Sequence, residues 1–588
     1  MRRLILAALL ATGSIAGGAA PAAAAPSDDL KRVMDEHWAW LLKNNPVLAS
    51  SVGVRTYDDQ LGDSTLAAAD RVAAEAGGFA RRLAAIPDAG LTAPERIDKA
   101  ILLRAVSEQA EANRFGERTM NISTLGSWFT FLPELGNIVP LRTKADYQSY
   151  LTRIGQVPRF NDEQLAIARQ AVAEGFVQPC ATLTTTERQI TGAVPADATA
   201  SRFYEPFKRP KPFDMTDAEW QAMQGRARAV IGDAIRPAYA RTAAFFRTSY
   251  LPKCRQGVGI AALPEGAAYY AFLVRQQTTT DLTPDAIHRI GLNEVKRIGA
   301  AMDALARKAG FPSRAAFVAK LRTDPAYYPK TGGELMAAAA LQAKAIDGLM
   351  PRLFGRLPRL PYGVRAIPAE QAEGNTTAYY LGGAPEAGIA GYYYVNLTKL
   401  DQRPLWELPA LTAHEAVPGH HNQIALQQEM ELAPFRRHAA FFTAFTEGWG
   451  LYAEHLGIEL GLYDTPEKDM GRLSYEMWRA CRLVVDTGIH SKGWTKEQAI
   501  AFMKANSALT DANIDAEVNR YITNPGQALA YKLGELKFKE LRARAEKALG
   551  PKFDVRRFHD AVLSQGSVPL DVLETYMDGW VASEKARG

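Results

Sequence analysis

The sequence predicts a mainly α-helical protein: a large multi-helix body with a small antiparallel β-sheet inserted near residues 360–400. Apolar residues recur at helical spacing through most of the chain, which predicts amphipathic helices. Near residue 355 the pattern changes to proline-punctuated, aromatic and β-branched segments, which predicts short strands. The composition, 47% hydrophobic and 23% charged, is that of a globular protein and excludes disordered, collagen-like and multi-span membrane proteins.

The clearest predicted helix begins after Thr283, a good N-cap residue, with Pro284 in the first position and Gly310 at its end. Ser313 opens another short helix. Residues 30–110 and 215–247 are rich in Ala, Arg and Glu at helical spacing. These segments predict a long N-terminal helical region, residues 26–355, followed by a catalytic region, residues 356–588.

Residues 376–383 (TTAYYLGG) and 391–398 (GYYYVNLT) predict the strands of the small sheet, before helices resume near residue 405. Tyr392–Tyr394 and Asn396 are expected in an edge strand that pairs with an extended peptide. Packing of the aromatic residues on the helices explains this strand almost as well. Tyr393 and Asn396 are therefore candidate substrate-binding residues.

Residues 1–25 predict a cleavable signal peptide. Arg2 and Arg3 form a positive start, residues 4–15 are apolar but too short to span a bilayer, and residues 23–25 are alanines. The alternative is an uncleaved membrane anchor. No cysteine lies near this leader, which disfavours a lipoprotein. We therefore expect a periplasmic or secreted protein that is soluble after removal of the leader.

Three cysteines, Cys180, Cys254 and Cys481, are too few for a disulfide scaffold. In an oxidising compartment Cys180 and Cys254 could pair and leave Cys481 buried in a helix, or all three could be free thiols. The net charge of +5 is weak, and no basic run carries interleaved aromatic residues, so nucleic-acid binding is not expected.

Six of the nine histidines fall between residues 414 and 490. In the segment TAHEAVPGHHNQ (412–423), His414-Glu415 resembles the arrangement in which a histidine binds zinc and the next glutamate activates water. The usual second histidine at i+4 is replaced by Pro418. On a straight helix His421 would return to the face of His414, whereas a kink at Pro418 and Gly419 would bring His420 back.

The segment FTAFTEGWGLYAE (442–454) supplies a third candidate ligand, Glu447, from a following helix. Three protein ligands leave one position open for water, and Glu415 would accept a proton from it. Glu454 lies two turns after Glu447 on the same face, so it either orients a histidine ligand or is a solvated charge.

Four motifs together carry a family resemblance: HEAVPGHH, TEGWGLYAE, DTGIHSKGW (486–494) and NPGQALAYKLGE (524–535). They resemble the domain-of-unknown-function 885 family of mostly bacterial proteins, strongly over residues 405–535. This resemblance implies a zinc metallopeptidase-like protein of gluzincin type, mainly helical, with a deep cleft that takes short peptides. Dipeptidyl peptidase III is similar in that its zinc motif also departs from i+4 spacing and ends in Gly-His, which favours His420 over His421.

The later motifs predict supporting residues. Asp486 and His490 are four apart, so on a helix the carboxylate would hold the imidazole. His490 and Tyr531 are the candidate donors to the oxyanion of the reaction, and Arg520 is placed to bind a substrate carboxylate, with Gln527 nearby. Core packing and a structural ion pair are the alternatives for Tyr531 and Arg520.

The sequence thus predicts an exported peptidase with one Zn²⁺ per chain bound by His414, His420 and Glu447, with His421 as the alternative to His420. The same nitrogen and carboxylate ligands accept cobalt or manganese. An amidase or esterase on the same site is a second hypothesis, because these reactions share a tetrahedral intermediate. A periplasmic protein that captures peptides without cleaving them is a third.

Overall fold

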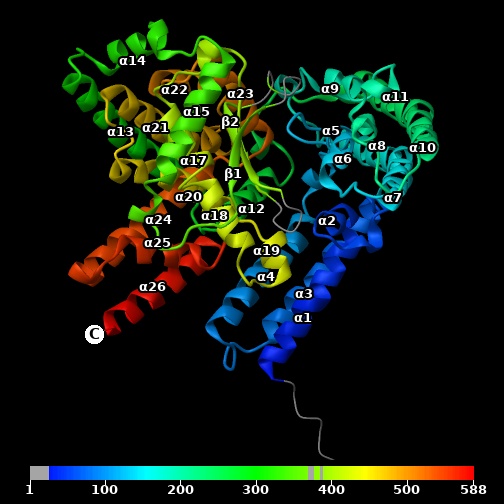
Figure 1. Ribbon diagram of the computed structural model, residues 1–588, viewed down its shortest axis with the longest axis horizontal. Helices are drawn as coiled ribbons and strands as arrows, with labels where there is room; N and C mark the ends of the chain where they lie inside the picture. The colour runs from blue at the N-terminus through cyan, green and yellow to red at the C-terminus, as the bar shows by residue number, and fades with distance from the viewer. Residues whose placement is uncertain (1–24, 368–371, 373–375, 384–388, 588) are drawn as a thin grey trace, which may run out of the picture.

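The computed structural model describes residues 25–367, 372, 376–383 and 389–587, and the predicted signal peptide lies outside these residues. The described chain is mainly α-helical with one small sheet, as predicted. A lobe built from the helices α5 to α11 stands apart from a larger body that contains the sheet and the C-terminal helices (Figure 1). The helices α1 and α3 run beneath both, and the C-terminus follows α26 on the other side.

The first part of the chain forms these lower helices and the separate lobe. The helices of this part are α1 (Pro26–Asn44), α2 (Pro46–Ser51), α3 (Leu66–Ala85), α4 (Ala93–Ala112), α5 (Trp128–Phe131), α6 (Leu135–Ile138), α7 (Lys144–Ile154), α8 (Val157–Glu174), α9 (Thr186–Gly192), α10 (Asp217–Ala229) and α11 (Arg236–Phe245). One buried apolar cluster, from Leu61 to Tyr250, forms the core of the lobe.

The rest of the chain forms the larger body. Its helices are α12 (Gly266–Thr278), α13 (Pro284–Lys308), α14 (Arg314–Thr323), α15 (Gly332–Asp347), α17 (Leu408–Glu415), α18 (His420–Gln428), α19 (Pro434–His438), α20 (Thr443–Leu460), α21 (Pro466–Lys492), α22 (Lys496–Asn506), α23 (Asp511–Thr523), α24 (Leu529–Leu549), α25 (Val555–Leu563) and α26 (Leu570–Ala586).

Local signals in the sequence set several of these boundaries. The helix predicted after Thr283 is α13, and the Thr283 side chain accepts a hydrogen bond from the backbone N–H of Ala286. Ser313 caps α14 in the same way, through Ala316. In each case the cap satisfies a backbone N–H that the first helical turn leaves without a partner.

The hydrophobic cores cross the boundary predicted near residue 355. One core packs Leu30 and Ile101 of the N-terminal helices against Trp449 of α20 and Phe538 of α24. Another packs Ile298 of α13 against the later helices α21 to α23. The two predicted regions therefore share cores, and α20, α21 and α24 lie in the centre of the larger body.

The sheet has three strands, β1 (Tyr362–Ala366), β2 (Ala378–Leu381) and β3 (Gly391–Val395), in the order β1-β3-β2. β3 pairs antiparallel with β2 but parallel with β1. The prediction of an antiparallel sheet was therefore wrong for one of its two pairings. The prediction that β3 is an edge strand was also wrong, because a described strand lies on each side of it.

Cys180 and Cys254 form a disulfide within the first part of the chain, and Cys481 is a buried free thiol in α21. This confirms the first of the two arrangements that the sequence left open. No helix among the described residues combines the length and the apolar character that a membrane span requires.

Candidate metal centre

The segment between α17 and α18 breaks the helix that carries the histidine motif. α17 ends at Glu415, the Val417–Pro418 peptide bond is cis, and α18 begins at His420. A side chain on Gly419 would collide with the carbonyl oxygen of His414, 1.9 Å from its Cβ. Proline therefore ends α17, and glycine allows the chain to fold tightly back on it. The predicted kink is a full break between two helices.

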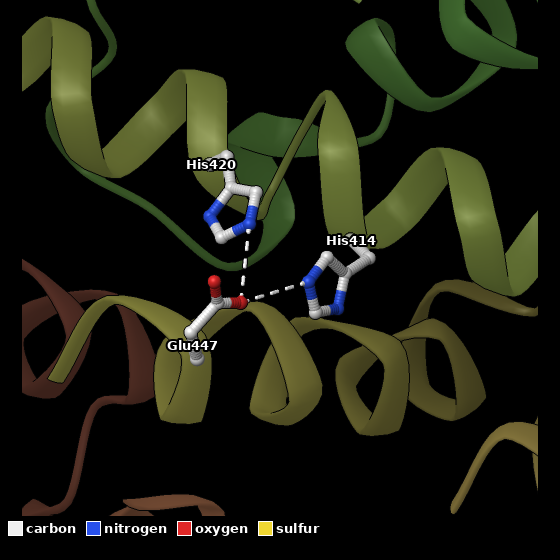
Figure 2. Close-up of side chains that lie close together, drawn as sticks. All are labelled: His414, His420 and Glu447. Carbon is white, nitrogen blue, oxygen red and sulfur yellow. Dashed lines mark ion pairs between the residues drawn. The ribbon is translucent and has the colours of Figure 1, made fainter. Parts of the chain in front are cut away.

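This break places His414 and His420 on the same side, facing Glu447 of α20 (Figure 2). The Nε2 atoms of His414 and His420 each lie 3.5 Å from Oε2 of Glu447. One ligand atom from each of the three residues lies within 4.8 Å of the others. Glu415 Oε2 is 4.0 Å from His420 Nε2, so the motif's carboxylate stands at the rim of the cluster.

The distances from Glu447 to the two histidines fit a tetrahedral metal ion. Ligand bonds of about 2.0–2.2 Å place tetrahedral ligand atoms about 3.3–3.6 Å apart, which matches the two distances of 3.5 Å from Glu447. Two imidazoles and one carboxylate form the donor set of a catalytic zinc site that keeps a fourth position open. The residues present therefore fit one divalent ion.

Contacts behind His414 fix the orientation of its ring. Its Nδ1 lies 2.8 Å from Oε1 of Glu454, and the same oxygen forms an ion pair with Nη2 of Arg479 at 3.0 Å. A carboxylate on Nδ1 leaves Nε2 free to act as a ligand, as is common for metal-binding histidines. Glu454 thus has the orienting position that the sequence predicted. His420 lacks this support, because its Nδ1 is buried without a hydrogen-bond partner among the described residues.

The charges around the two histidines favour a cation. Burial acts to lower the pKa of His414, but Glu447 and Glu454 raise it to about 9. Burial acts to raise the pKa of Glu447, but His414 and His420 hold it well below its usual value. Three carboxylates, those of Glu415, Glu447 and Glu454, surround the histidines, and one guanidinium offsets one of them. A divalent ion would neutralise the two negative charges that remain.

His421 points away from this cluster. Its Nδ1 lies 2.9 Å from the Tyr380 hydroxyl on β2, and its ring packs against Tyr362 on β1. Burial lowers its pKa to about 4, so the ring is neutral at neutral pH. His421 thus joins α18 to the sheet, and of the two alternatives for the second ligand the structure brings His420 to the cluster.

Glycines on α20 allow the close approach of the other elements. A Cβ on Gly450 would lie 2.7 Å from Cε1 of His414, so only glycine leaves room for the ligand ring. A Cβ on Gly448 would lie 2.5 Å from the Cα of Gly534 on α24, so the backbones of α20 and α24 are in contact. Glu447 and Tyr531 are therefore carried by two helices held at minimal separation.

The structure brings Tyr531, Arg520 and Gln527 together beside the cluster. The Tyr531 ring stacks near His414, with 6.5 Å between ring centroids. Nη2 of Arg520 donates to the Tyr531 hydroxyl at 3.0 Å and to Oε1 of Gln527 at 2.8 Å. These three predicted residues thus form one hydrogen-bonded group that reaches a candidate ligand.

His490 is not part of this group. The backbone N–H of Ile260 donates to its Nδ1 at 3.2 Å, and its Nε2 donates to the Tyr521 carbonyl at 2.9 Å. Both ring nitrogens are thus used, and the side chain is fully buried. These two hydrogen bonds join α21 to the segments of Ile260 and Tyr521, and they leave no ring N–H of His490 to donate to an oxyanion.

The predicted pairing of Asp486 with His490 was wrong. The Asp486 carboxyl accepts hydrogen bonds from the Tyr270 hydroxyl at 2.6 Å and from the backbone N–H of Gly526 at 3.1 Å. Burial raises its pKa to about 7. α21 is buried on several sides, so partners from other segments replace the residue one turn away.

Tyr393 and Asn396 have structural positions. Tyr393 is fully buried among the apolar residues between the sheet, α15 and α17. The Asn396 side chain donates to the Ala372 carbonyl at 2.7 Å and accepts from the backbone N–H of Thr398 at 3.0 Å. Neither is placed on an open strand edge that a peptide could join, so the predicted peptide contact through this strand was wrong.

Two arginines of α21, Arg479 and Arg482, are site residues that the sequence analysis missed. Arg479 forms an ion pair with the carboxylate behind His414, and Arg482 lies over the Tyr531 ring at 4.4 Å from its centroid. Both lie on the buried face of a helix that is rich in apolar residues and also buries Glu476 and Asp486. Charged residues on such a face, three positions apart, are the signal that could have found them.

A family model described as "Bacterial protein of unknown function (DUF885)" matches residues 46–577. Among curated proteins there is no match. A crystal structure described as a "putative lipoprotein" from Colwellia psychrerythraea is similar at 28% identity and a TM-score of 0.90, covering 95% of this chain and 100% of that one.

A second solved structure, described as a "putative lipoprotein of unknown function" from Shewanella oneidensis, covers 94% of this chain and 100% of that one. Its identity is 20% and its TM-score 0.70, so it shows the shared fold alone.

Proposed function

The chain belongs to the DUF885 family of bacterial proteins, and we propose that it is an exported, metal-dependent hydrolase of short peptides. One observation carries this proposal: ligand atoms of His414, His420 and Glu447 converge to within 4.8 Å of one another, as in a metal site, and Glu415 stands beside them. A binding protein has no need for a carboxylate placed next to an open metal position, whereas hydrolysis requires a base there.

A zinc ion held by these three residues would act as a Lewis acid and would lower the pKa of a water molecule bound to it. Glu415 supplies the base. Its carboxylate is about one-tenth exposed and lies 4.0 Å from His420 Nε2, beside the three candidate ligands. It accepts a proton from the attacking water and returns it to the leaving amine.

Tyr531 supplies the hydrogen-bond donor for the oxygen of the peptide carbonyl. Its ring lies beside His414, and its hydroxyl accepts a hydrogen bond from Arg520 at 3.0 Å. Because Arg520 donates to a lone pair of the phenol oxygen, the phenol proton is directed away from Arg520 and is available to the peptide carbonyl. A donor placed in advance stabilises the charge that develops on the carbonyl oxygen.

Export is supported by two features. The disulfide between Cys180 and Cys254 is of a kind that persists in oxidising compartments outside the cytosol. The similar solved structure from Colwellia psychrerythraea is described as a "putative lipoprotein", a class of exported protein. We therefore propose that the reaction takes place outside the cytosol.

The test is metal analysis and peptide hydrolysis by the wild type and by Glu415→Gln. We expect about one zinc per chain in both proteins, because Glu415 is not a ligand, and a loss of kcat of at least about 100-fold in the variant. Asp285→Asn, an exposed substitution on α13, is the control for the effects of preparing and assaying a variant. Full activity in Glu415→Gln would overturn the mechanism, and zinc without turnover of any peptide would favour a binding protein.

A further inference from the structure

A positively charged pair of arginines lies beside the candidate metal centre. Arg482 of α21 and Arg520 of α23 share a single carboxylate, Glu517, at 2.9 Å and 3.5 Å. Among the described residues no other carboxylate forms an ion pair with either arginine. Burial acts to raise the pKa of Glu517, but the two arginines lower it to about 2, so it is ionised. One positive charge therefore remains without a counter-charge.

One donor of this pair is buried and unused. Nη1 of Arg482 has no hydrogen-bond partner within the described part of the chain, and its side chain is 2% exposed. The guanidinium lies 4.4 Å from the ring centroids of both Trp478 and Tyr531. A buried guanidinium donor without an acceptor costs free energy, and an anionic ligand would supply the acceptor.

Arg520 is the solvent-exposed member of the pair. Its side chain is 27% exposed, whereas that of Arg482 is buried. Nη2 of Arg520 is used by Tyr531 and Gln527, and its Nη1 has only the long contact of 3.5 Å with Glu517. The partly exposed guanidinium thus keeps donor capacity toward a ligand that enters beside Tyr531.

Tyr531 connects this pair to the cluster. Its ring stacks near His414, Arg482 lies over the ring, and Arg520 bonds its hydroxyl. A peptide advances about 3.3–3.6 Å per extended residue. A group held by the arginines would therefore belong to a residue only a few positions from a carbonyl held at the cluster.

We propose that Arg482 and Arg520 form a subsite for a substrate carboxylate close to the scissile bond. This inference rests on the proposed function and names its substrate class: peptides with a carboxylate within a few residues of the cleaved bond. Arginine forks bind carboxylates through paired, charge-assisted hydrogen bonds. The carboxylate belongs either to the C-terminus of the peptide or to an Asp or Glu side chain, and both satisfy the same guanidinium donors.

The test uses matched short peptides: one with a free C-terminal carboxylate, the same peptide amidated, and an amidated peptide with Asp near its C-terminus. For the zinc-loaded wild type we expect kcat/KM to be about 100-fold higher for a carboxylate-bearing peptide than for the neutral one, since loss of one partner of a desolvated charge pair costs a factor of this order. The free-acid and Asp peptides separate the two sources of the carboxylate.

Arg520→Gln should bring this ratio to within about threefold of one, because the fork is lost. Arg544→Gln, an exposed change on α24, should leave the ratio as in the wild type. Equal rates for all three peptides in the wild type would overturn the subsite. The subsite would also be overturned if Arg520→Gln slowed the hydrolysis of all three peptides equally and kept the ratio of their rates. Arg520 would then serve only to position Tyr531.

Calorimetric binding of the same peptides separates this inference from the proposed function. Tighter binding of a carboxylate-bearing peptide that is lost in Arg520→Gln, without hydrolysis, would support the subsite and overturn the hydrolase. Hydrolysis with no preference in either binding or rate would support the hydrolase and overturn the subsite. Circular dichroism of each variant checks that the fold is kept.

Discussion

The indole nitrogen of Trp449 donates a hydrogen bond to the carbonyl oxygen of Pro418 at 2.8 Å. Trp449 is fully buried on α20, two residues after Glu447, and Pro418 lies in the break between the two histidine-bearing helices. This single bond therefore ties the turn that positions His420 to the helix that carries the third candidate ligand.

Trp449→Phe should loosen this connection. It removes the hydrogen bond, leaves a buried carbonyl oxygen without its partner and deletes part of a large ring, so we expect a loss of about 2–4 kcal/mol in the free energy of unfolding. Zinc affinity should fall as well, because the turn is no longer held. The measurements are denaturant unfolding and zinc competition with a chelating dye.

Trp220→Phe in the separate lobe is the control for Trp449→Phe, since Trp220 belongs to a different core. It should lower stability while leaving zinc affinity unchanged. Equal zinc affinity in Trp449→Phe and the wild type would show that the turn is held by other contacts.

Gly450→Ala should weaken metal binding through His414. The new methyl group would lie 2.7 Å from Cε1 of the imidazole, so the ring must move away from Glu447. We expect a drop in zinc affinity of at least about tenfold, since metal sites depend on ligand placement. Gly579→Ala on α26 meets open space and should instead stabilise its helix by about 0.5–1 kcal/mol. An unchanged zinc affinity in Gly450→Ala would contradict the fixed position of the ring.

Glu454→Gln should lower zinc affinity without removing a ligand. The change weakens the acceptor of His414 Nδ1 and removes the charge paired with Arg479 at 3.0 Å. Loss of such a supporting carboxylate lowers metal affinity by about 10–100-fold. Glu459→Gln, on the same helix but paired with Arg542, is the matched control. If both variants bind zinc like the wild type, Glu454 has no role in the site.

Asp486→Asn should remove a pH dependence of stability. In the folded chain burial holds the pKa of Asp486 at about 7, above its ordinary value of 3.8. The unfolded chain releases the proton near pH 4 and the folded chain keeps it, so this residue lowers the free energy of unfolding as the pH rises from about 4 to about 7. Below pH 4 both states hold the proton, and the penalty is absent.

Asparagine keeps an acceptor for Tyr270 and Gly526 but does not ionise. The stability of Asp486→Asn relative to the wild type should therefore grow by about 1–4 kcal/mol between pH 4 and pH 7. Urea unfolding at pH 4, 5.5 and 7 measures this difference. A difference that stays constant with pH would show that Asp486 is ionised in the folded chain.

The break in the chain between His414 and His420 could be predicted because its determinants are local. His414, Pro418, Gly419 and His420 lie within seven residues, and a proline followed by a glycine ends a helix for steric reasons alone. The helix caps at Thr283 and Ser313 follow from one side chain and one backbone N–H each. In each case residues close in sequence decide the geometry.

The misplaced residues depend on contacts between distant segments. Asp486 and His490 are one turn apart, but their partners Tyr270 and Ile260 lie more than 200 residues earlier in the chain. A spacing rule for an isolated helix does not apply where other elements cover several of its faces. The strand that contains Tyr393 shows the same limit, because its sequence does not reveal that strands pair on both sides.

The backbone contact between Gly448 and Gly534 sets the distance from Glu447 to Tyr531, although neither glycine bears a reactive group. A larger side chain at either position would push α20 and α24 apart, and would move the phenol relative to the ligand without altering either one. Relatives that carry alanine or serine there would hold the same reactive groups at a different spacing. Substrate preference in such proteins would then be tuned by backbone separation, in a pair of positions that a comparison of reactive residues would overlook.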